Sequence, residues 1–290
     1  MARNNKDRTR ASRPDNTAES IAAANAQNEY QGDMGLSFVV PTEFVELPSA
    51  GKYYPAEHPL HKSEVVEIRH MTAKDEDTLT SRALLKKGLA IDRLLDNIIV
   101  DKSIKADSLL VGDRNAVLVH TRIHAYGPDY TTRAICPTCG AKAENNFNLL
   151  EVEHVDNDVS EMNVEGPSQD GTFIITLPKT GAQAEVRLLS GVDEKQVLRV
   201  MENRKKNRLA EKPITTQMKQ YVVSVNGVTD RSQLNHFIEN MPTLDAQYMR
   251  VAYNKLVPNI DMTLPFNCAE CGTESRLEVP FTSEFFWPNG

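Results

Sequence analysis

The residues of this sequence with the clearest capacity for chemistry are its four cysteines. They form two pairs of the same pattern, Cys136-Pro137-Thr138-Cys139-Gly140 and Cys268-Ala269-Glu270-Cys271-Gly272. The two-residue gap lets both thiolates of a pair face one ion, and the glycine supplies the backbone freedom that a tight turn needs. We therefore predict one structural Zn²⁺ site with four thiolate ligands, Cys136, Cys139, Cys268 and Cys271.

Three other interpretations of the cysteines stay open at this point. Disulfides would suit an oxidising compartment, but the N-terminus has no apolar signal-peptide core, so we expect a cytoplasmic protein with reduced thiols. A thioredoxin-like redox pair would open a helix, whereas both pairs here lie between strand-like segments. Unpaired free thiols rarely show such matched spacing. A catalytic zinc is not expected, because four thiolates leave no open position for water or substrate.

Each cysteine pair lies at the tip of a predicted hairpin. Residues 130–135 lead into the first pair and residues 143–149 leave it. Residues 262–267 and 274–279 do the same for the second pair. Because one ion would take ligands from both pairs, we expect the two hairpins to lie together in a zinc-ribbon-like site.

The composition is that of an ordinary globular protein. Of the 290 residues, 40% are apolar and 25% are charged, which allows one elaborated domain or two modest ones. The net charge of -7 argues against a protein that mainly coats nucleic acid. No apolar run approaches the roughly 18 residues of a membrane span.

The chain is expected to fall into three regions. Residues 1–35 are basic, polar and Ala/Asn-rich, which predicts a disordered arm that is either solvated or docked on an acidic partner or nucleic acid. Residues 36–150 form a predicted N-terminal α+β region that ends in the first cysteine pair. Residues 151–290 form a C-terminal α+β region that ends in the second pair and an aromatic terminus. The predicted fold class is α+β, with a mostly helical body, short strands and hairpins.

Local patterns predict the elements of this body. Thr72 with Asp75, and Ser190 with Asp193, fit capping boxes at helix starts. Ile91, Leu94, Leu95 and Ile98 follow helical periodicity. Further predicted helices cover residues 81–88, 116–125, 215–225, 231–240 and 243–256. For 116–125 the run Val117-Leu118-Val119 would also suit a strand, and the helical spacing of its apolar residues favours the helix. Predicted strands cover residues 65–69, 172–177 and 184–188, of which the last two read as a hairpin.

Other side chains that could act lack a matching constellation. His120 and His124 are four residues apart on a predicted helix and could hold a metal, although such pairs are more often incidental. The basic run at residues 204–208 is either a phosphate-binding patch or cations that favour a helix C-terminus. The aromatic residues of 281–288 are either a core-closing cap or an exposed docking segment. The sequence has no phosphate-binding glycine loop, G-x-S-x-G elbow or H-E-x-x-H pair.

Several linked motifs resemble a known family. They are residues 45–55, 71–77 and 110–115, the C-P-x-C-G pair and the terminal Phe285-Phe286-Trp287-Pro288. From about Phe38 to the C-terminus, the chain resembles the baseplate hub subunit and hub-assembly proteins of T-even-type contractile-tailed bacteriophages.

The resemblance implies a structural or assembly role in virion formation, without enzymatic activity. The implied partners are other hub and tail proteins, with no small-molecule substrate. The implied location is the host cytoplasm during assembly, and then the tail baseplate. No catalytic residue is carried over from the family, and the zinc prediction rests on the cysteines themselves.

The alternative function is a zinc-ribbon protein that binds nucleic acid. Such a ribbon would carry basic residues around its cysteines. Here Arg133 and Lys142 stand among acidic residues, Glu144, Glu270, Glu274 and Glu278. The charge balance therefore disfavours this alternative.

Overall fold

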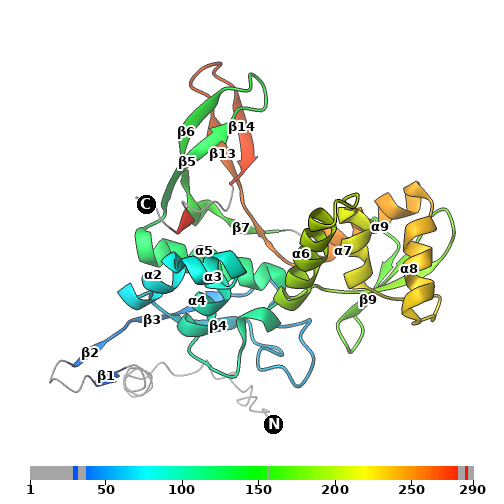
Figure 1. Cartoon of the computed structure of the whole chain (residues 1–290), viewed down its shortest axis with the longest axis horizontal. Coiled ribbons are helices and arrows are strands. Elements are labelled where there is room, and N and C mark those ends of the chain that lie inside the picture. Colours follow the sequence, from blue (N-terminus) through cyan, green and yellow to red (C-terminus); the bar gives the residue numbers. More distant parts are fainter. Residues whose placement is uncertain (1–28, 32–36, 156, 280–284, 287–290) are drawn as a thin grey trace, which may run out of the picture. The chain divides into compact units, whose positions relative to one another are not determined.

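The computed structural model describes residues 29–31, 37–155, 157–279 and 285–286 (Figure 1). The chain divides into two compact units, residues 1–43 and 44–290. In the first unit, β1 (Glu29–Gln31) pairs antiparallel with β2 (Ser37–Val39). Most of the predicted arm, residues 1–35, lies outside the described residues.

The second unit contains most of the helices and strands. The helices are α2 (Ala73–Thr80), α3 (Arg82–Lys87), α4 (Ala90–Ile98), α5 (Val111–Tyr126), α6 (Gly191–Lys206), α7 (Pro213–Tyr221), α8 (Arg231–Asn240) and α9 (Thr243–Leu256), with short 3-10 turns η1 (Ala106–Ser108) and η2 (Leu149–Glu151). The strands are β3 (Thr42–Glu46), which begins in the first unit, β4 (Val65–Arg69), β5 (Asp129–Ile135), β6 (Lys142–Asn148), β7 (Glu153–His154), β8 (Val164–Glu165), β9 (Thr172–Thr176), β10 (Gln183–Arg187), β11 (Val222–Val225), β12 (Ile260–Asp261), β13 (Thr263–Asn267) and β14 (Glu274–Glu278).

The α+β class is confirmed, but the prediction of a mostly helical body is wrong. Among the residues that the structure describes, helices hold 39% and strands hold 24%. One correction lies at the predicted helix 215–225, which ends at Tyr221 and continues as β11. The run Val-Val-Ser-Val of β11 is β-branched, and it completes an antiparallel sheet of order β11-β10-β9-β8. The predicted hairpin is confirmed as β9 and β10.

The second unit contains an internal repeat. It is clearest where β4 and β10 run into helices. Residues 67–76 and 185–194 share the pattern Glu-x-Arg-x-x-Ser/Thr-x-x-Asp-Glu. The N–H and hydroxyl of Thr72 donate to Asp75 Oδ2 at 2.9 and 2.8 Å. The N–H and hydroxyl of Ser190 donate to Asp193 Oδ2, both at 2.9 Å. Both predicted helix starts are thus confirmed, with the same geometry.

The arginines of the two copies also bind alike. Arg69 donates through both Nη atoms to Asp75, at 2.7 and 3.0 Å. Arg187 donates through both Nη atoms to Asp193, at 2.8 and 2.6 Å. Each bidentate pair fixes the end of a strand to the first turn of the following helix.

A second matched feature joins the long helices α5 and α9 to Leu-Pro-x-x-Gly turns at residues 47–51 and 177–181. Asp113, in the first turn of α5, accepts from the N–H and hydroxyl of Ser49 at 2.9 and 2.6 Å. Asp245, in the first turn of α9, accepts from the N–H and hydroxyl of Thr180 at 3.0 and 2.7 Å. Both carboxylates are completely buried.

The repeat extends into the hairpins that carry the cysteines. Asp129 and Cys136 of the first copy correspond in spacing and order to Asp261 and Cys268 of the second. Each half of the unit therefore contains a Leu-Pro turn, a strand ending in the arginine motif, further helices, a long helix and a cysteine hairpin. We call the two copies, residues 45–149 and 175–279, the first and second halves.

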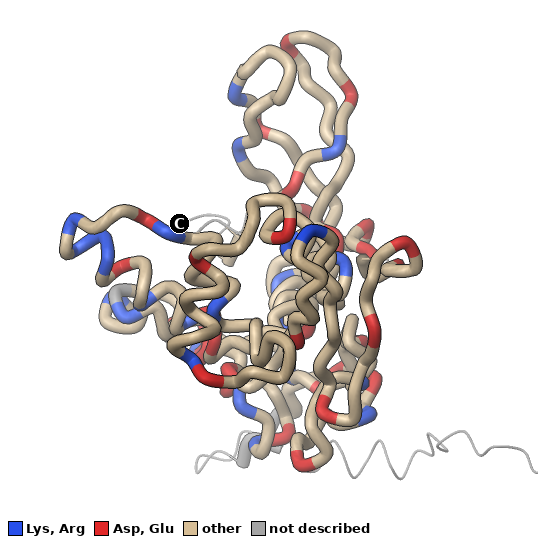
Figure 2. Tube along the Cα trace, turned by 90° about the vertical axis from the view of Figure 1, so that its right-hand side faces the viewer, with Lys and Arg blue, Asp and Glu red and all other residues tan. Residues whose placement is uncertain are grey.

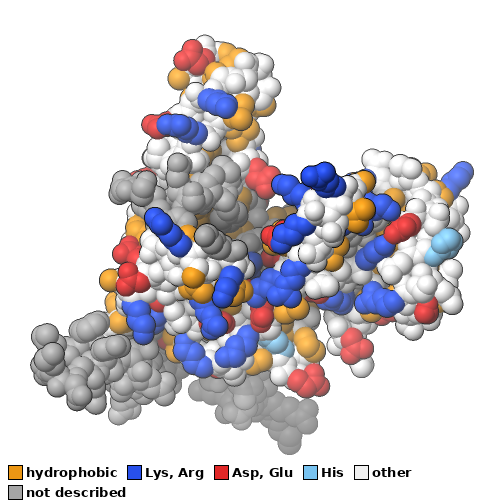
Figure 3. All heavy atoms as spheres, viewed as in Figure 1, with side chains coloured by type: hydrophobic (Ala, Val, Ile, Leu, Met, Phe, Trp, Pro, Cys, Tyr) orange, Lys and Arg blue, Asp and Glu red, His pale blue; other side chains and the backbone are white. Residues whose placement is uncertain are grey.

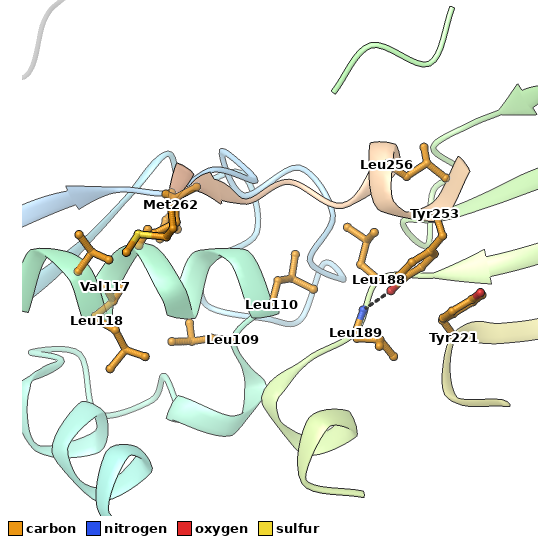
Figure 4. Close-up of a cluster of buried hydrophobic side chains, with 14 of the residues drawn as sticks. Leu109, Leu110, Val117, Leu118, Leu188, Leu189, Tyr221, Tyr253, Leu256 and Met262 are labelled. Carbon is orange, nitrogen blue, oxygen red and sulfur yellow. Dashed lines mark hydrogen bonds between the residues drawn. The ribbon is translucent and has the colours of Figure 1, made fainter. Parts of the chain in front are cut away.

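The halves meet through backbone pairing and a shared apolar core. Leu189 of the second half donates its N–H to the Tyr253 hydroxyl at 3.1 Å, and its carbonyl accepts from Val111 N of the first half at 3.1 Å. Figure 4 shows Leu188 and Leu189 between the start of α5 and Tyr253. The ring of Tyr253 also stacks on Tyr221, with centroids 3.9 Å apart. Among the described residues, no helix is long and apolar enough to cross a membrane.

Candidate metal centre

Each cysteine pair forms the turn of a two-stranded ribbon, β5 with β6 and β13 with β14. Gly140 donates its N–H to the Cys136 carbonyl at 3.0 Å, and Gly272 donates to the Cys268 carbonyl at 2.8 Å. Gly140 has φ +72° and Gly272 has φ +68°, a left-handed conformation that side chains with Cβ adopt at a cost. The glycine after each pair is therefore required by the backbone of the turn, as the sequence predicted.

The ribbons bring the four cysteine sulfurs together from both halves. Cys136 Sγ lies 3.7 Å from Cys271 Sγ, and Cys139 Sγ lies 3.7 Å from Cys268 Sγ. All four sulfurs lie within 4.8 Å of one another. A tetrahedral Zn²⁺ with Zn–S bonds of about 2.3 Å separates its sulfurs by about 3.8 Å. The donor set and its spacing therefore fit zinc, whereas a disulfide needs sulfurs about 2.05 Å apart.

The four cysteines place the candidate site at the tips of the two ribbons. Strand β13 packs beside β6, and Figure 1 shows the two ribbons next to each other. Cys136 and Cys268 are buried, whereas Cys139 and Cys271 are exposed. The predicted approach of two hairpins distant in sequence is thus confirmed.

One thiol of the cluster is prepared to ionise at neutral pH. The Thr273 hydroxyl lies 3.1 Å from Cys271 Sγ. Hydrogen bonds from that hydroxyl and from the Thr273 N–H lower the pKa of Cys271 to about 6. A thiolate is the form that binds metal.

The surface of the ribbons carries charges of both signs, as Figure 2 shows on the tube of the same strands. The basic residues are Arg133, Lys142 and Arg276, and the acidic ones are Asp129, Glu144, Glu270, Glu274 and Glu278. An interspersed surface of this kind gives no basic stripe for a phosphate backbone. The geometry adds no support to the nucleic-acid alternative.

The predicted histidine pair, His120 and His124, lies on α5, outside the two ribbons that carry the cysteines. The rings of His120 and His124 stack with centroids 6.4 Å apart and planes 13° apart. Burial lowers the pKa of both, and for His124 the neighbouring His70 and His120 lower it further. Their interpretation as incidental neighbours stays a prediction.

Asp113 is a central residue whose role the sequence patterns did not reveal. Besides Ser49, its carboxylate accepts from the Tyr54 hydroxyl at 2.7 Å. That hydroxyl in turn accepts from Leu110 N at 3.0 Å. Burial raises the pKa of Asp113, whereas the hydrogen bonds from Ser49 and Tyr54 oppose the rise. This network explains why residues 45–55 and 110–115 occur together as linked motifs, and comparing Asp113 with Asp245 could have revealed it.

Of the aromatic terminus, the structure describes Phe285 and Phe286, and both side chains are buried. The Phe285 ring meets Tyr130 of β5 edge-on, with centroids 5.1 Å apart. This burial supports the core-closing interpretation for these two residues, while Trp287 lies outside the described part of the chain. The predicted basic run ends α6, and most of its side chains are exposed.

Comparison with known proteins supports the family resemblance that the linked motifs indicated. Neither the curated proteins nor the solved structures gave a match. The family model described as T4 bacteriophage base plate protein matches residues 40–287, which include both halves and both cysteine pairs. The chain belongs to the T4 bacteriophage base plate protein family.

Proposed function

We propose that this protein is a structural or assembly component of the tail baseplate hub, in which one Zn²⁺ joins the two ribbons. The observation that carries the zinc proposal is the group of four sulfurs, with its two 3.7 Å separations. Membership of the base plate family supports a structural role in the phage tail. The proposed partners are other hub and tail proteins, first in the host cytoplasm and then in the baseplate.

The proposed ion would act as a crosslink. Four thiolates fill the coordination sphere of Zn²⁺, so no position remains for a substrate or an activated water. The ion would connect cysteines 129 positions apart, Cys139 and Cys268, near the ends of the two halves. Closing so long a loop restricts the unfolded chain and thereby stabilises the folded one. A rigid pair of ribbons would suit a protein that works through contacts with its neighbours.

Elemental analysis tests the zinc proposal. We expect one zinc per chain in protein purified without chelators. Both Cys136→Ser and Cys268→Ser should lose that zinc and lower the melting temperature, because each removes a ligand from the same ion. Thr138→Ser, which changes a non-ligand position of the first pair, serves as the control and should keep both. Well under half an equivalent of zinc in the unsubstituted protein would contradict the proposal.

Mass spectrometry of purified virions and of tail-assembly intermediates tests the baseplate role. We expect the chain in the finished baseplate if it is a hub subunit, and only in intermediates if it is an assembly factor. Its absence from both fractions would refute the role. A gel-shift assay over a range of salt concentrations tests the nucleic-acid alternative, for which salt-dependent binding is the expected sign.

A further inference from the structure

The second half carries an open groove of about 450 Å³ between α6, α7, α9 and the start of α5. Its lining is largely apolar, with Val197 and Leu198 of α6 on one side and, on another, Tyr253 of α9 and Val257 directly after that helix. Leu198 is 61% exposed. A leucine this exposed at the edge of an apolar hollow marks a surface that can gain apolar contact.

The internal repeat identifies the counterpart of this groove in the first half. The shared motif aligns Val197 with Leu79, and the matching ends of α4 and α7 align Gln217 with Leu94. Leu79 and Leu94 are completely buried, whereas Val197 is half-buried and Gln217 is exposed. At these two positions the side chains are covered in the first half and more open in the second.

In the first half, Arg122 of α5 stands at the position of Asn254, which lines the groove in the second half. Arg122 is 1% exposed and donates to the carbonyls of Gly127 and Asp129 at 2.8 and 3.1 Å. Its guanidinium lies 5.2 Å from the ring centre of Tyr126 and 5.9 Å from that of Tyr130. Phe285 then covers Tyr130. An arginine, two tyrosines and Phe285 thus pack together and close the core of the first half.

The second half lacks each of these closing groups. The spacing that aligns the cysteine pairs places Asn254 at the position of Arg122, Pro258 at that of Tyr126 and Met262 at that of Tyr130. The counterparts of Phe285 and Phe286 are the polar residues of β7, Glu153–His154. Val155, directly after β7, lines the groove. Among the residues that the structure describes, the groove keeps an open, largely apolar surface.

The charge beside the groove indicates the chemistry of an occupant. The exposed cations of α6 and of the residues just after it are Arg199, Lys205, Lys206 and Arg208, with Glu202 among them. Glu194 lines the groove and is paired with Arg114. Figure 3 shows Lys and Arg side chains gathered over α6 and α7. This concentration of positive charge stands out in a chain of net charge -7. It would attract an acidic segment and favour its orientation along α6.

We propose that this groove docks an extended segment of another tail protein, one that is acidic and carries aromatic or large aliphatic side chains. The proposal rests on the proposed baseplate function only for the source of the segment. Aromatic side chains inserted into an apolar pocket supply most of the binding energy of such contacts.

Site-specific photocrosslinking in infected host cells identifies the occupant. A photoreactive phenylalanine analogue replaces Leu198 in the groove or, as a matched control, Leu244, a 56% exposed leucine of α9 that does not line the groove. We expect position 198, and not 244, to capture an acidic peptide of another tail protein with a large apolar side chain at the crosslink. Capture of a second copy of this chain, of a basic peptide, or of nothing would overturn the proposal.

Charge substitutions then test the energetics. Leu198→Asp should lower co-purification of the crosslinked partner at least tenfold. Arg199→Glu should also lower co-purification, and its effect should be larger at low salt than at high salt. Leu244→Asp should change it less than twofold. All three variants should keep the zinc content and melting temperature, because the substituted side chains are exposed. If the unsubstituted chain enters tails and Leu198→Asp assembles equally well, the groove proposal fails while the baseplate function stands.

Discussion

At the scale of single residues, buried carboxylates organise this protein as much as the cysteines do. Asp113 and Asp245 each accept several hydrogen bonds from a Leu-Pro turn more than 60 residues away in the sequence. The Ser49 N–H and hydroxyl are buried and would otherwise lack this acceptor, which costs about 1–3 kcal/mol per group. Each carboxylate thereby fixes a long helix to the start of its own half.

Asp113→Ala tests this role. The substitution leaves the Ser49 N–H, the Ser49 hydroxyl and the Tyr54 hydroxyl without their acceptor, so we expect the free energy of unfolding to fall by about 3 kcal/mol. Urea unfolding measures the change. Asp77→Ala, at an exposed aspartate of α2, is the control and should change stability by less than about 0.5 kcal/mol. Equal effects of the two substitutions would show that the network contributes little.

At the scale of elements, the junction between strand and helix is built twice from the same parts. In each copy a bidentate arginine–aspartate pair sits where the helix begins, and the aspartate also accepts from the N-cap residue. Negative charge in the first turn further suits the helix dipole. The capping patterns were readable from sequence because all their members lie within ten residues.

These junctions predict how stability depends on pH. Burial acts to raise the pKa of Asp193, but Arg187 and Ser190 lower it below its usual range. Because the folded-state pKa is below the unfolded one, the stabilisation is present above pH 4 and is lost as the pH falls through the folded value. Urea unfolding should find Asp193→Asn less stable by about 1–2 kcal/mol at pH 7. The difference between variant and parent should shrink toward pH 2, and a constant difference would contradict the prediction.

At the scale of the whole molecule, the two halves differ most in how they are closed. In the first half Phe285 is completely buried against Tyr130, whereas the second half has an open groove beside α6 and α9. Burial of a phenylalanine ring is among the larger single contributions to a core. The end of the chain therefore completes a half that begins more than 200 residues earlier.

Phe285→Ala measures that contribution. The cavity left beside Tyr130 should lower the free energy of unfolding by about 3–5 kcal/mol. The matched control is Phe44→Ala, because Phe44 is 67% exposed and its removal leaves no cavity. Chemical denaturation compares the two. If Phe285→Ala is as stable as the control, the aromatic end does not close the core, and a docking role for it returns.

The sequence by itself determined the local features of this protein. The two C-x-x-C-G patterns specified the turns and the glycine conformation, and the helix starts at Thr72 and Ser190 followed from capping residues a few positions apart. The hairpin of β9 and β10 was likewise readable from alternation and a turn. Interactions of this kind need only neighbours along the chain, so their patterns are visible without the fold.

Only the tertiary structure decided the features that depend on distant segments. Val222–Val225 follow a helix and became a strand because β10 offered an edge with backbone groups to pair. The spacing of the sulfurs arose because β13 packs beside β6, a contact that no local pattern encodes. The groove of the second half could not be predicted from the sequence. Whether Gln217 or its counterpart Leu94 is exposed depends on which distant residues cover it. Burial is a property of the assembled chain, and it separated two halves that share the same local motifs.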